Sequence, residues 1–182
     1  MVMNENYRTH CALTGLPLRR EAMKQLSEIV ESAAECEGGA VGVVFANIFR
    51  LKIPHDDFGH PAVDEALQKV AKIVQSLAGE SGIACRYGGN TFLLILPDTS
   101  PEETKRKAEE LREAARRVTF ERDGQICYRV TLSIGVAHTS TFTTHTRFKS
   151  SNLAGAEALM AMADWAMSMD RFENDRRSVA AL

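Results

Sequence analysis

Two short apolar runs, at residues 83–85 and 92–96, are separated by a segment that contains Gly88, Gly89 and Asn90. Because Gly and Asn tolerate positive φ, this pattern predicts two strands joined by a tight turn, a β-hairpin. A turn of this kind presents a side chain and bare backbone N–H groups, which can bind a phosphate. The sequence therefore predicts a β-sheet in the middle of the chain and, with it, a candidate anion-binding turn.

Helical and strand patterns alternate on both sides of this hairpin. Apolar residues recur at helical spacing in four segments, residues 18–36, 61–77, 102–117 and 153–171. Further apolar runs predict strands at residues 40–47, 118–121 and 127–137, the last two joined as a second hairpin. The order α-β-α-β-β-α-β-β-α predicts an α/β or α+β sandwich, with helices flanking a mixed, largely antiparallel sheet.

Three segments between and after these elements are expected to be irregular. Pro54 predicts irregular structure over residues 48–57, since its ring opposes a regular helix. Residues 139–151 are rich in Ser and Thr and predict a mobile loop. Residues 173–177 predict a charged tail after the last helix.

The last predicted helix carries the single tryptophan of the chain, Trp165. We expect Trp165 in the core, because a large aromatic on a helix more often packs inside than at a contact surface. The alternative is an interface in which Trp165 joins Phe142, Phe148 and Phe172.

The composition is that of one soluble domain. The chain has 182 residues, 45% hydrophobic and 25% charged, with a net charge of -2, which is enough for one full core. This net charge does not indicate a nucleic-acid-binding surface. No apolar run reaches the roughly 20 residues of a membrane span. Residues 1–10 lack the apolar core of a signal peptide. The four cysteines match no metal or CxxC spacing, which predicts reduced thiols in a cytoplasmic protein. We expect a flexible N-terminus at residues 1–10, one domain at 11–177 and a tail at 178–182.

The central hairpin, RYGGNTF at residues 86–92, resembles the signature R-Y-G-G-[D/E]-E-F of the GGDEF family, the diguanylate cyclases. Four other segments resemble the family in register: LTGLPLRR at 13–20, residues 47–67, SIGVA at 133–137 and Ala163-Asp164. The resemblance covers about residues 11–177 and implies a ferredoxin-like or nucleotidyl-cyclase-like sandwich. It agrees with the element order obtained from periodicity.

The resemblance also implies a chemistry, from which this chain departs. In active relatives each domain binds one GTP, two domains together make cyclic di-GMP, and two carboxylates hold two Mg²⁺ or Mn²⁺ ions. The positions of those carboxylates are Asn47 and Asn90 here, the signature Glu is Thr91, and the second Asp of the first motif is Phe49. Since hard cations prefer anionic oxygen ligands, we expect Mg²⁺ binding to be weak or absent and the cyclisation to be lost.

Other family positions that contact the nucleotide are partly kept. The guanine-binding Asn falls on His55 and its Asp partner on Asp64, which also suits a helix N-terminus. The resemblance assigns further possible nucleotide contacts to Lys52, His60, Gly88, Gly89 and Arg171. GTP is therefore a possible ligand even without turnover. Lys52 and Arg171 are equally compatible with plain solvation.

The product-inhibition site of the family is expected to be absent. Relatives that use it carry R-x-x-D ending six residues before the first signature glycine. Those two positions are Gly79 and Gly82 here. Arg is the residue that clamps guanine and phosphate in such a site, so we expect no cyclic di-GMP binding there.

Three functions follow from these observations. The first is a catalytically inactive GGDEF domain that acts as a regulatory or interaction module, with a phosphodiesterase domain, another GGDEF domain or another signalling protein as partner. The second is a domain that senses GTP or a related nucleotide without turnover. The third is a residual cyclase or an NTP hydrolase, with a displaced metal site formed by His55, Asp56 and Asp57.

Overall fold

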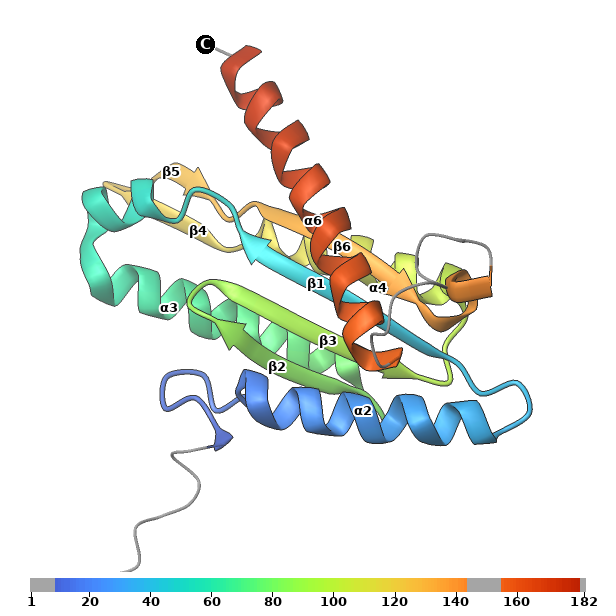
Figure 1. Ribbon diagram of the computed structural model, residues 1–182. Helices are drawn as coiled ribbons and strands as arrows, with labels where there is room; N and C mark the ends of the chain where they lie inside the picture. Colours follow the sequence, from blue (N-terminus) through green and yellow to red (C-terminus); the bar gives the residue numbers. More distant parts are fainter. Residues whose placement is uncertain (1–8, 144–154, 181–182) are drawn as a thin grey trace, which may run out of the picture.

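The computed structural model describes residues 9–143 and 155–180, in which helices pack on a central sheet (Figure 1). The elements are α2 (Arg19–Glu35), β1 (Val41–Ile48), α3 (Lys52–Ala78), β2 (Ile83–Gly88), β3 (Thr91–Pro97), α4 (Pro101–Ala115), β4 (Thr119–Arg122), β5 (Gln125–Arg129), β6 (Leu132–His138), the 3-10 helix η1 (Thr139–Thr143) and α6 (Gly155–Ala180). Most of the predicted loop at 139–151 lies outside the described residues, as do residues 1–8 of the predicted N-terminus.

The main sheet has the strand order β2-β3-β1-β6, and each neighbouring pair is antiparallel. β1 is central, with Phe45 opposite Leu93 on β3 and opposite Gly135 on β6. All eight residues of β1 are buried, because helices cover both faces of the sheet. This is why β1 is a continuous apolar run instead of an alternating one.

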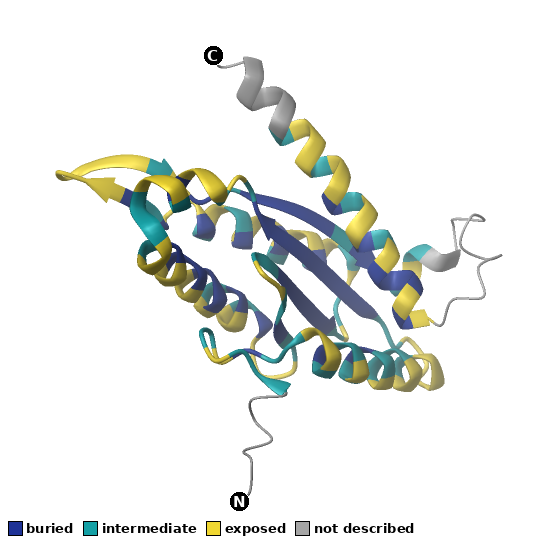
Figure 2. Ribbon diagram, turned by 60° about the vertical axis from the view of Figure 1, so that its left-hand side comes forward, coloured by how far each residue is buried: buried dark blue, intermediate teal, exposed yellow. Residues whose placement is uncertain are grey.

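Two helices cover each face of the sheet. Val44 and Ala46 of β1 face a core shared with α3 and α4, whereas Val43 and Phe45 face a core shared with α2 and α6. Strands β1, β3 and β6 are almost entirely buried between these two layers (Figure 2). The α+β sandwich expected from the sequence is confirmed.

α6 lies unusually close to β6. A Cβ atom added to Gly135 would lie 1.9 Å from the carbonyl oxygen of Ala163 and 2.3 Å from the backbone nitrogen of Met167. Only glycine allows this approach, since those neighbours are backbone atoms that cannot rotate away. The SIGVA segment is thus explained by packing of the edge strand against α6.

The prediction of irregular structure at residues 48–57 is wrong for its second half, because α3 begins at Lys52. Pro54 is the third residue of this helix, and first-turn N–H groups have no acceptor within the helix, so Pro is tolerated there. The helical path is interrupted at Gly59, where φ is 78° and ψ is 177°. The predicted helix at 61–77 is the second segment of α3, after this kink.

Two other predictions need correction. The predicted strand 127–137 is two strands: β5 pairs with β4 in a separate two-stranded sheet, and β6 joins the main sheet. The last helix does not end at Arg171 but continues to Ala180, so the predicted charged tail is helical. Its residues are mostly good helix formers, and charge alone was a poor indication of irregular structure.

Ser100 caps α4, and the four cysteines are unpaired. The side chain of Ser100 caps α4 by accepting a hydrogen bond from the backbone N–H of Glu103 at 3.1 Å, with Pro101 in the first turn. All four cysteines are free thiols. Within the described ranges, no helix combines the length and the apolar character that crossing a lipid bilayer would require.

Candidate functional site

The ends of β1 and β3 bring together the residues at the predicted metal positions. Asn47 on β1 lies opposite Thr91 on β3 in the antiparallel register. Asn90, the last residue of the signature turn, directly precedes Thr91, and its carbonyl oxygen accepts a hydrogen bond from the Ile48 backbone N–H at 2.9 Å. The antiparallel pairing therefore places two neutral amides and one hydroxyl side by side.

The amides of Asn47 and Asn90 bind each other. Asn47 Nδ2 donates to Asn90 Oδ1 at 3.1 Å and to Thr91 Oγ1 at 2.8 Å. Asn90 Nδ2 donates to the Ile48 carbonyl oxygen at 2.8 Å and to Asn47 Oδ1 at 3.4 Å. Asn47 is buried, with 9% of its surface exposed. Both amide oxygens and both amide nitrogens are thus engaged within the protein.

Phe49 occupies the remaining predicted acidic position, beside a cavity. Its backbone N–H donates to the Thr131 carbonyl oxygen at 2.8 Å, and the Arg50 guanidinium carbon lies 5.1 Å from the centre of its ring. A cavity of about 420 Å³ lies beside it, lined mainly by apolar side chains such as Phe49, Ile53 and Phe120. The surroundings of Phe49 are therefore those of an aromatic packing site.

The signature turn is held by Arg86. Its Nε and Nη2 atoms donate to the Gly89 carbonyl oxygen at 3.1 and 2.8 Å, and the ladder is irregular between Arg86 and Gly88. The predicted hairpin is confirmed. The reason given for it, positive φ in the turn, is wrong, since Gly88, Gly89 and Asn90 do not have positive φ. A Cβ atom at either glycine would meet nothing within 4 Å. The surface over Gly88 and Gly89 is therefore open.

Arg86 also links the turn to Cys11, for which the sequence predicted only a reduced thiol. Arg86 Nη1 lies 3.0 Å from Cys11 Sγ and donates to it. Burial raises the pKa of Cys11, but hydrogen bonds from Thr14, Arg86 and the Leu13 backbone outweigh it and lower the pKa to about 7. The contact spans 75 positions of sequence, so no local pattern could have revealed it.

His55 and His60 meet across the kink of α3. His55 Nε2 lies 3.2 Å from both ring nitrogens of His60, and the ring planes are 80° apart with centres separated by 4.2 Å. Equal distances to both nitrogens and nearly perpendicular rings place this nitrogen over the face of His60. The contact is therefore an edge-to-face pair of the N–H···π kind.

The side chains of the predicted displaced metal site, His55, Asp56 and Asp57, do not converge on one point. His55 Nδ1 lies 3.3 Å from Asp56 Oδ1, but the Asp57 carboxylate instead accepts a hydrogen bond from the Tyr128 hydroxyl. That bond raises the pKa of Tyr128. In the part of the chain that the structure describes, no three His, Cys, Asp or Glu side chains are arranged to hold a metal ion.

The other predicted nucleotide contacts lie on the surface of two helices. Lys52 is exposed in the first turn of α3, Asp64 is exposed in its second segment, and Arg171 is exposed on α6. Asp170, next to Arg171, is directed inward: its Oδ2 accepts from the Ile134 backbone N–H at 2.8 Å and from Arg112 Nη1 at 3.2 Å. Asp170 therefore fixes the rotation of α6 on the edge of the sheet.

The backbone at the predicted inhibition-site positions suits only glycine. Gly79 ends α3 with φ 67° and ψ -155°. A Cβ atom at Gly82 would lie 2.4 Å from the Ala78 carbonyl oxygen and 2.9 Å from that of Ile95. Neither position can take a side chain without strain, in line with the absence of Arg and Asp from this segment.

The expectation that Trp165 lies in the core is wrong. Trp165 is 67% exposed, and Met169 and Phe172 on the same helix are 46% and 59% exposed. The helix buries Ala163 and Met167 instead. Helical periodicity alone could not distinguish the two faces, because α6 carries apolar residues on both.

Comparisons with known proteins agree with this fold. The family model described as Diguanylate cyclase, GGDEF domain, matches residues 9–168. The response regulator PleD of Caulobacter vibrioides is 36% identical over 129 residues, which is 70% of this chain and 28% of PleD. The diguanylate cyclase DgcP of Pseudomonas aeruginosa is 32% identical over 169 residues, 92% of this chain and 23% of DgcP. The chain spans about a quarter of the length of these curated relatives.

A solved structure has the same fold. The GGDEF domain of DgcB from Caulobacter crescentus, determined in complex with c-di-GMP, gives a TM-score of 0.79 at 23% identity. The match covers 95% of this chain and 94% of that domain. At this level of identity the comparison concerns the fold alone.

Proposed function

This chain belongs to the GGDEF domain family of diguanylate cyclases, and we propose that it is a member that lacks cyclase activity. In this proposal it acts as a regulatory or protein-interaction module in cyclic di-GMP signalling. Its partner is another protein domain, such as a phosphodiesterase domain, a second GGDEF domain or another signalling protein.

The observation that carries the proposal is the reciprocal amide pair of Asn47 and Asn90. Mg²⁺ prefers anionic oxygen ligands, and these positions offer neutral amides whose oxygens already accept hydrogen bonds. Thr91 Oγ1 accepts from Asn47 as well, and Phe49 has no oxygen ligand in its side chain. The residues present do not fit a pair of divalent cations, so we assign no step of catalysis to them.

Direct measurement of the product tests the proposal. The purified chain is incubated with GTP and with Mg²⁺ or Mn²⁺, and cyclic di-GMP is separated by chromatography beside an active GGDEF domain as positive control. We expect no product from this chain over the time in which the control consumes its GTP. Product formation that scales with the concentration of this chain would overturn the proposal.

The open surface over Gly88 and Gly89 favours a second candidate function, nucleotide binding without turnover. A turn without side chains leaves room for a ligand to approach the backbone. Isothermal titration with millimolar GTP, with and without Mg²⁺, tests this candidate. Binding in both conditions without product would support it, and no heat in either condition would remove it.

A further inference from the structure

The cavity beside Phe49 lies between the end of β1, the first turn of α3 and the strands β4 and β5. Figure 1 shows the first turns of α3 beside these two strands, which follow much later in the chain. The volume of about 420 Å³ is within the range of small-molecule sites, about 300–1,000 Å³. Much of the lining is apolar, from Phe49, Leu51, Ile53, Phe120 and Val130. The cavity therefore suits the apolar body of a small ligand.

The charge around the cavity is positive. Among the described residues, its lining contains two arginines, Arg50 and Arg129, and no acidic side chain. Arg50 lies against the lining, since its guanidinium carbon is 5.1 Å from the centre of the Phe49 ring. Arg129 is exposed on β5, and no residue that the structure describes forms an ion pair or a hydrogen bond with its guanidinium. An anion is therefore the charge that complements this cavity.

The two walls of the cavity are held together by contacts between α3 and the β4–β5 hairpin. The Tyr128 hydroxyl donates to the Asp57 carboxylate, and Arg122 Nη2 donates to the Asp57 carbonyl oxygen at 2.8 Å. The Phe58 ring centre lies 5.7 Å from that of Phe120 and 6.0 Å from that of Tyr128. These contacts hold the cavity open without a ligand, so binding does not have to order its walls.

We propose that this cavity binds a small organic anion, a carboxylate attached to an apolar acyl or aryl body. The apolar body packs among Phe49, Ile53 and Phe120. The carboxylate pairs with Arg129, because the planar guanidinium matches its two oxygens. One unpaired guanidinium balances one negative charge, which favours a carboxylate over a phosphate group that carries nearly two.

This site is separate from the positions that the family resemblance assigns to metal and nucleotide. Asn47, Asn90, Gly88 and Gly89 do not line the cavity. The inference goes beyond the proposed function and does not depend on it, because binding is measured without GTP or a divalent cation. A cyclase assay and this binding experiment can therefore fail independently of each other.

Titration of the ¹⁵N-labelled chain with octanoate and, separately, with 2-naphthoate tests the proposal by amide chemical shifts. A ligand of about ten heavy atoms binds a site of this kind with a dissociation constant of about 0.1–1 mM. We expect saturable shifts centred on residues 48–53 and 128–131. Saturation by octanoate alone identifies an acyl body, and saturation by 2-naphthoate alone identifies an aryl body. 1-Octanol and octylamine share the octyl chain and should bind at least about fivefold more weakly, because neither pairs with Arg129.

Two pairs of variants locate the site. Arg129→Gln should raise the dissociation constant at least about tenfold, since it removes a charge-assisted hydrogen bond. Its control is Arg20→Gln, which removes the same charge from an exposed position on α2. Ile53→Glu places an anion in the lining and should abolish binding. Its control is Ile126→Glu, because Ile126 is 47% exposed, much like Ile53 at 42%, but does not line the cavity. The amide spectra show that each variant is folded.

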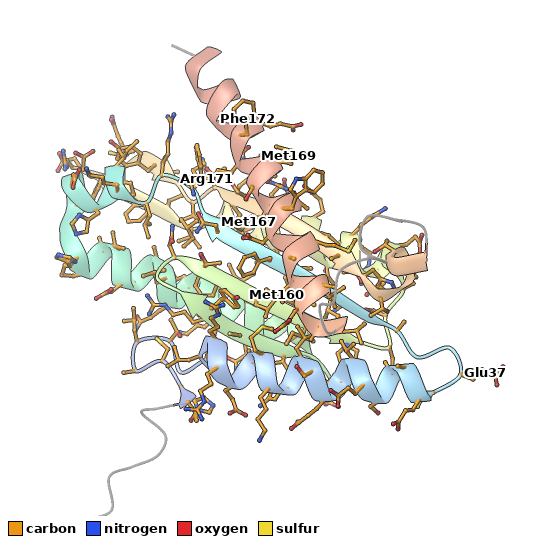
Figure 3. The ribbon with its side chains drawn as sticks, in the orientation of Figure 1. Glu37, Met160, Met167, Met169, Arg171 and Phe172 are labelled. Atoms are coloured by element: carbon orange, nitrogen blue, oxygen red, sulfur yellow. The ribbon has the colours of Figure 1, made fainter. Side chains whose placement is uncertain are left out.

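Three results would overturn the proposal. The first is the absence of saturable shifts with both carboxylates. The second is binding that Arg129→Gln leaves unchanged, or equal binding of octanoate, 1-octanol and octylamine. The third is a set of shifts confined to Met169, Phe172 and their neighbours, an exposed apolar surface on the part of α6 that extends past the sheet (Figure 3). Such shifts would show nonspecific uptake of the apolar chain.

Discussion

Asn47 Nδ2 donates a hydrogen bond to Asn90 Oδ1 at 3.1 Å, across the ends of β1 and the signature turn. Asn90 Nδ2 returns a longer bond to Asn47 Oδ1 at 3.4 Å. Each amide thus satisfies part of the hydrogen-bonding capacity of the other, with Asn47 buried and Asn90 half-buried. Two ionised carboxylates cannot do this, because neither has a donor and their charges repel each other.

The first prediction concerns Asn90→Asp. The new oxygen would face the Ile48 carbonyl oxygen, to which Asn90 Nδ2 now donates at 2.8 Å. An acceptor facing an acceptor at this half-buried position costs about 1–3 kcal/mol, and we expect the free energy of unfolding to fall by that amount. Urea unfolding measures it. Asn47→Asp should cost at least as much, because Asn47 is buried and its new oxygen would face Asn90 Oδ1, even if the Thr91 hydroxyl turns and donates to it.

The second prediction concerns Asn47→Asp combined with Asn90→Asp. Two adjacent carboxylates repel each other, and a divalent cation between them relieves the repulsion. We expect 10 mM Mg²⁺ to raise the Tm of this double variant by about 3–6 °C, the shift that binding with a Kd near 1 mM gives. The wild-type chain should shift by less than about 1 °C, as expected without differential binding. KCl at equal ionic strength is the control, and an equal Mg²⁺ shift in the wild type would contradict the prediction.

The third prediction compares two glycines of one hairpin region. A Cβ at Gly82 would lie 2.4 Å from the Ala78 carbonyl oxygen, whereas a Cβ at Gly89 meets nothing within 4 Å. We expect Gly82→Ala to lower the free energy of unfolding by about 1–3 kcal/mol and Gly89→Ala to change it by less than about 0.5 kcal/mol. Denaturant unfolding of the two variants side by side measures both. Equal effects would show that the segment at Gly82 relaxes freely.

The element order and the core were predictable from the sequence, whereas the pairing of elements was not. The continuous apolar run at β1 predicts a buried strand, and the helical spacing of apolar residues predicts α2, α4 and the second part of α3. It does not show that residues 127–137 divide between two sheets, since a strand pattern carries no information about its partner. The start of α3 was missed because Pro54 was treated as a helix breaker without regard to its place in the first turn.

The candidate site was predictable in composition but not in contacts. The motif spacing places Asn47, Asn90 and Thr91 at the acidic positions of the family motifs. The structure shows that the three side chains are hydrogen-bonded to one another through Asn47. The bond between Arg86 and Cys11 and the ring contact of His55 and His60 depend on tertiary packing. The exposure of Trp165 depends on which face of α6 meets β6, and Gly135 decides this through close contact with Ala163.

The fourth prediction concerns the fixing of α6 by Asp170. Its half-buried carboxylate accepts from the Ile134 backbone N–H at 2.8 Å and from Arg112 Nη1 at 3.2 Å. Asp170→Ala leaves both donors without this acceptor and should lower the free energy of unfolding by about 1–3 kcal/mol. Glu113→Ala, which removes an exposed ion pair with Arg116, is the control and should cost less than about 0.5 kcal/mol. Similar losses of free energy of unfolding in both variants would show that Asp170 contributes no more to stability than an exposed ion pair does.

The fifth prediction concerns the reactivity of Cys11, whose pKa is lowered to about 7. In a Cys36→Ser, Cys127→Ser background, which removes the two exposed thiols, the rate of alkylation by iodoacetamide should rise with a midpoint near pH 7. Arg86→Met removes a hydrogen bond to the thiolate and should move the midpoint upward, toward the ordinary value of 9.0. The buried Cys85, whose pKa is raised to about 12 by burial, should stay unreactive in this range.

The lowered pKa of Cys11 also makes the free energy of unfolding depend on pH. The pKa of Cys11 is lower in the folded chain than in the unfolded one, so the folded state releases its proton first. The thiolate therefore stabilises the fold fully above about pH 9, and this contribution is lost as the pH falls toward 7. Urea unfolding at pH 7 and 9 should show a gain in stability that Cys11→Ser reduces. An identical pH dependence in wild type and Cys11→Ser would contradict the link between Cys11, Arg86 and the signature turn.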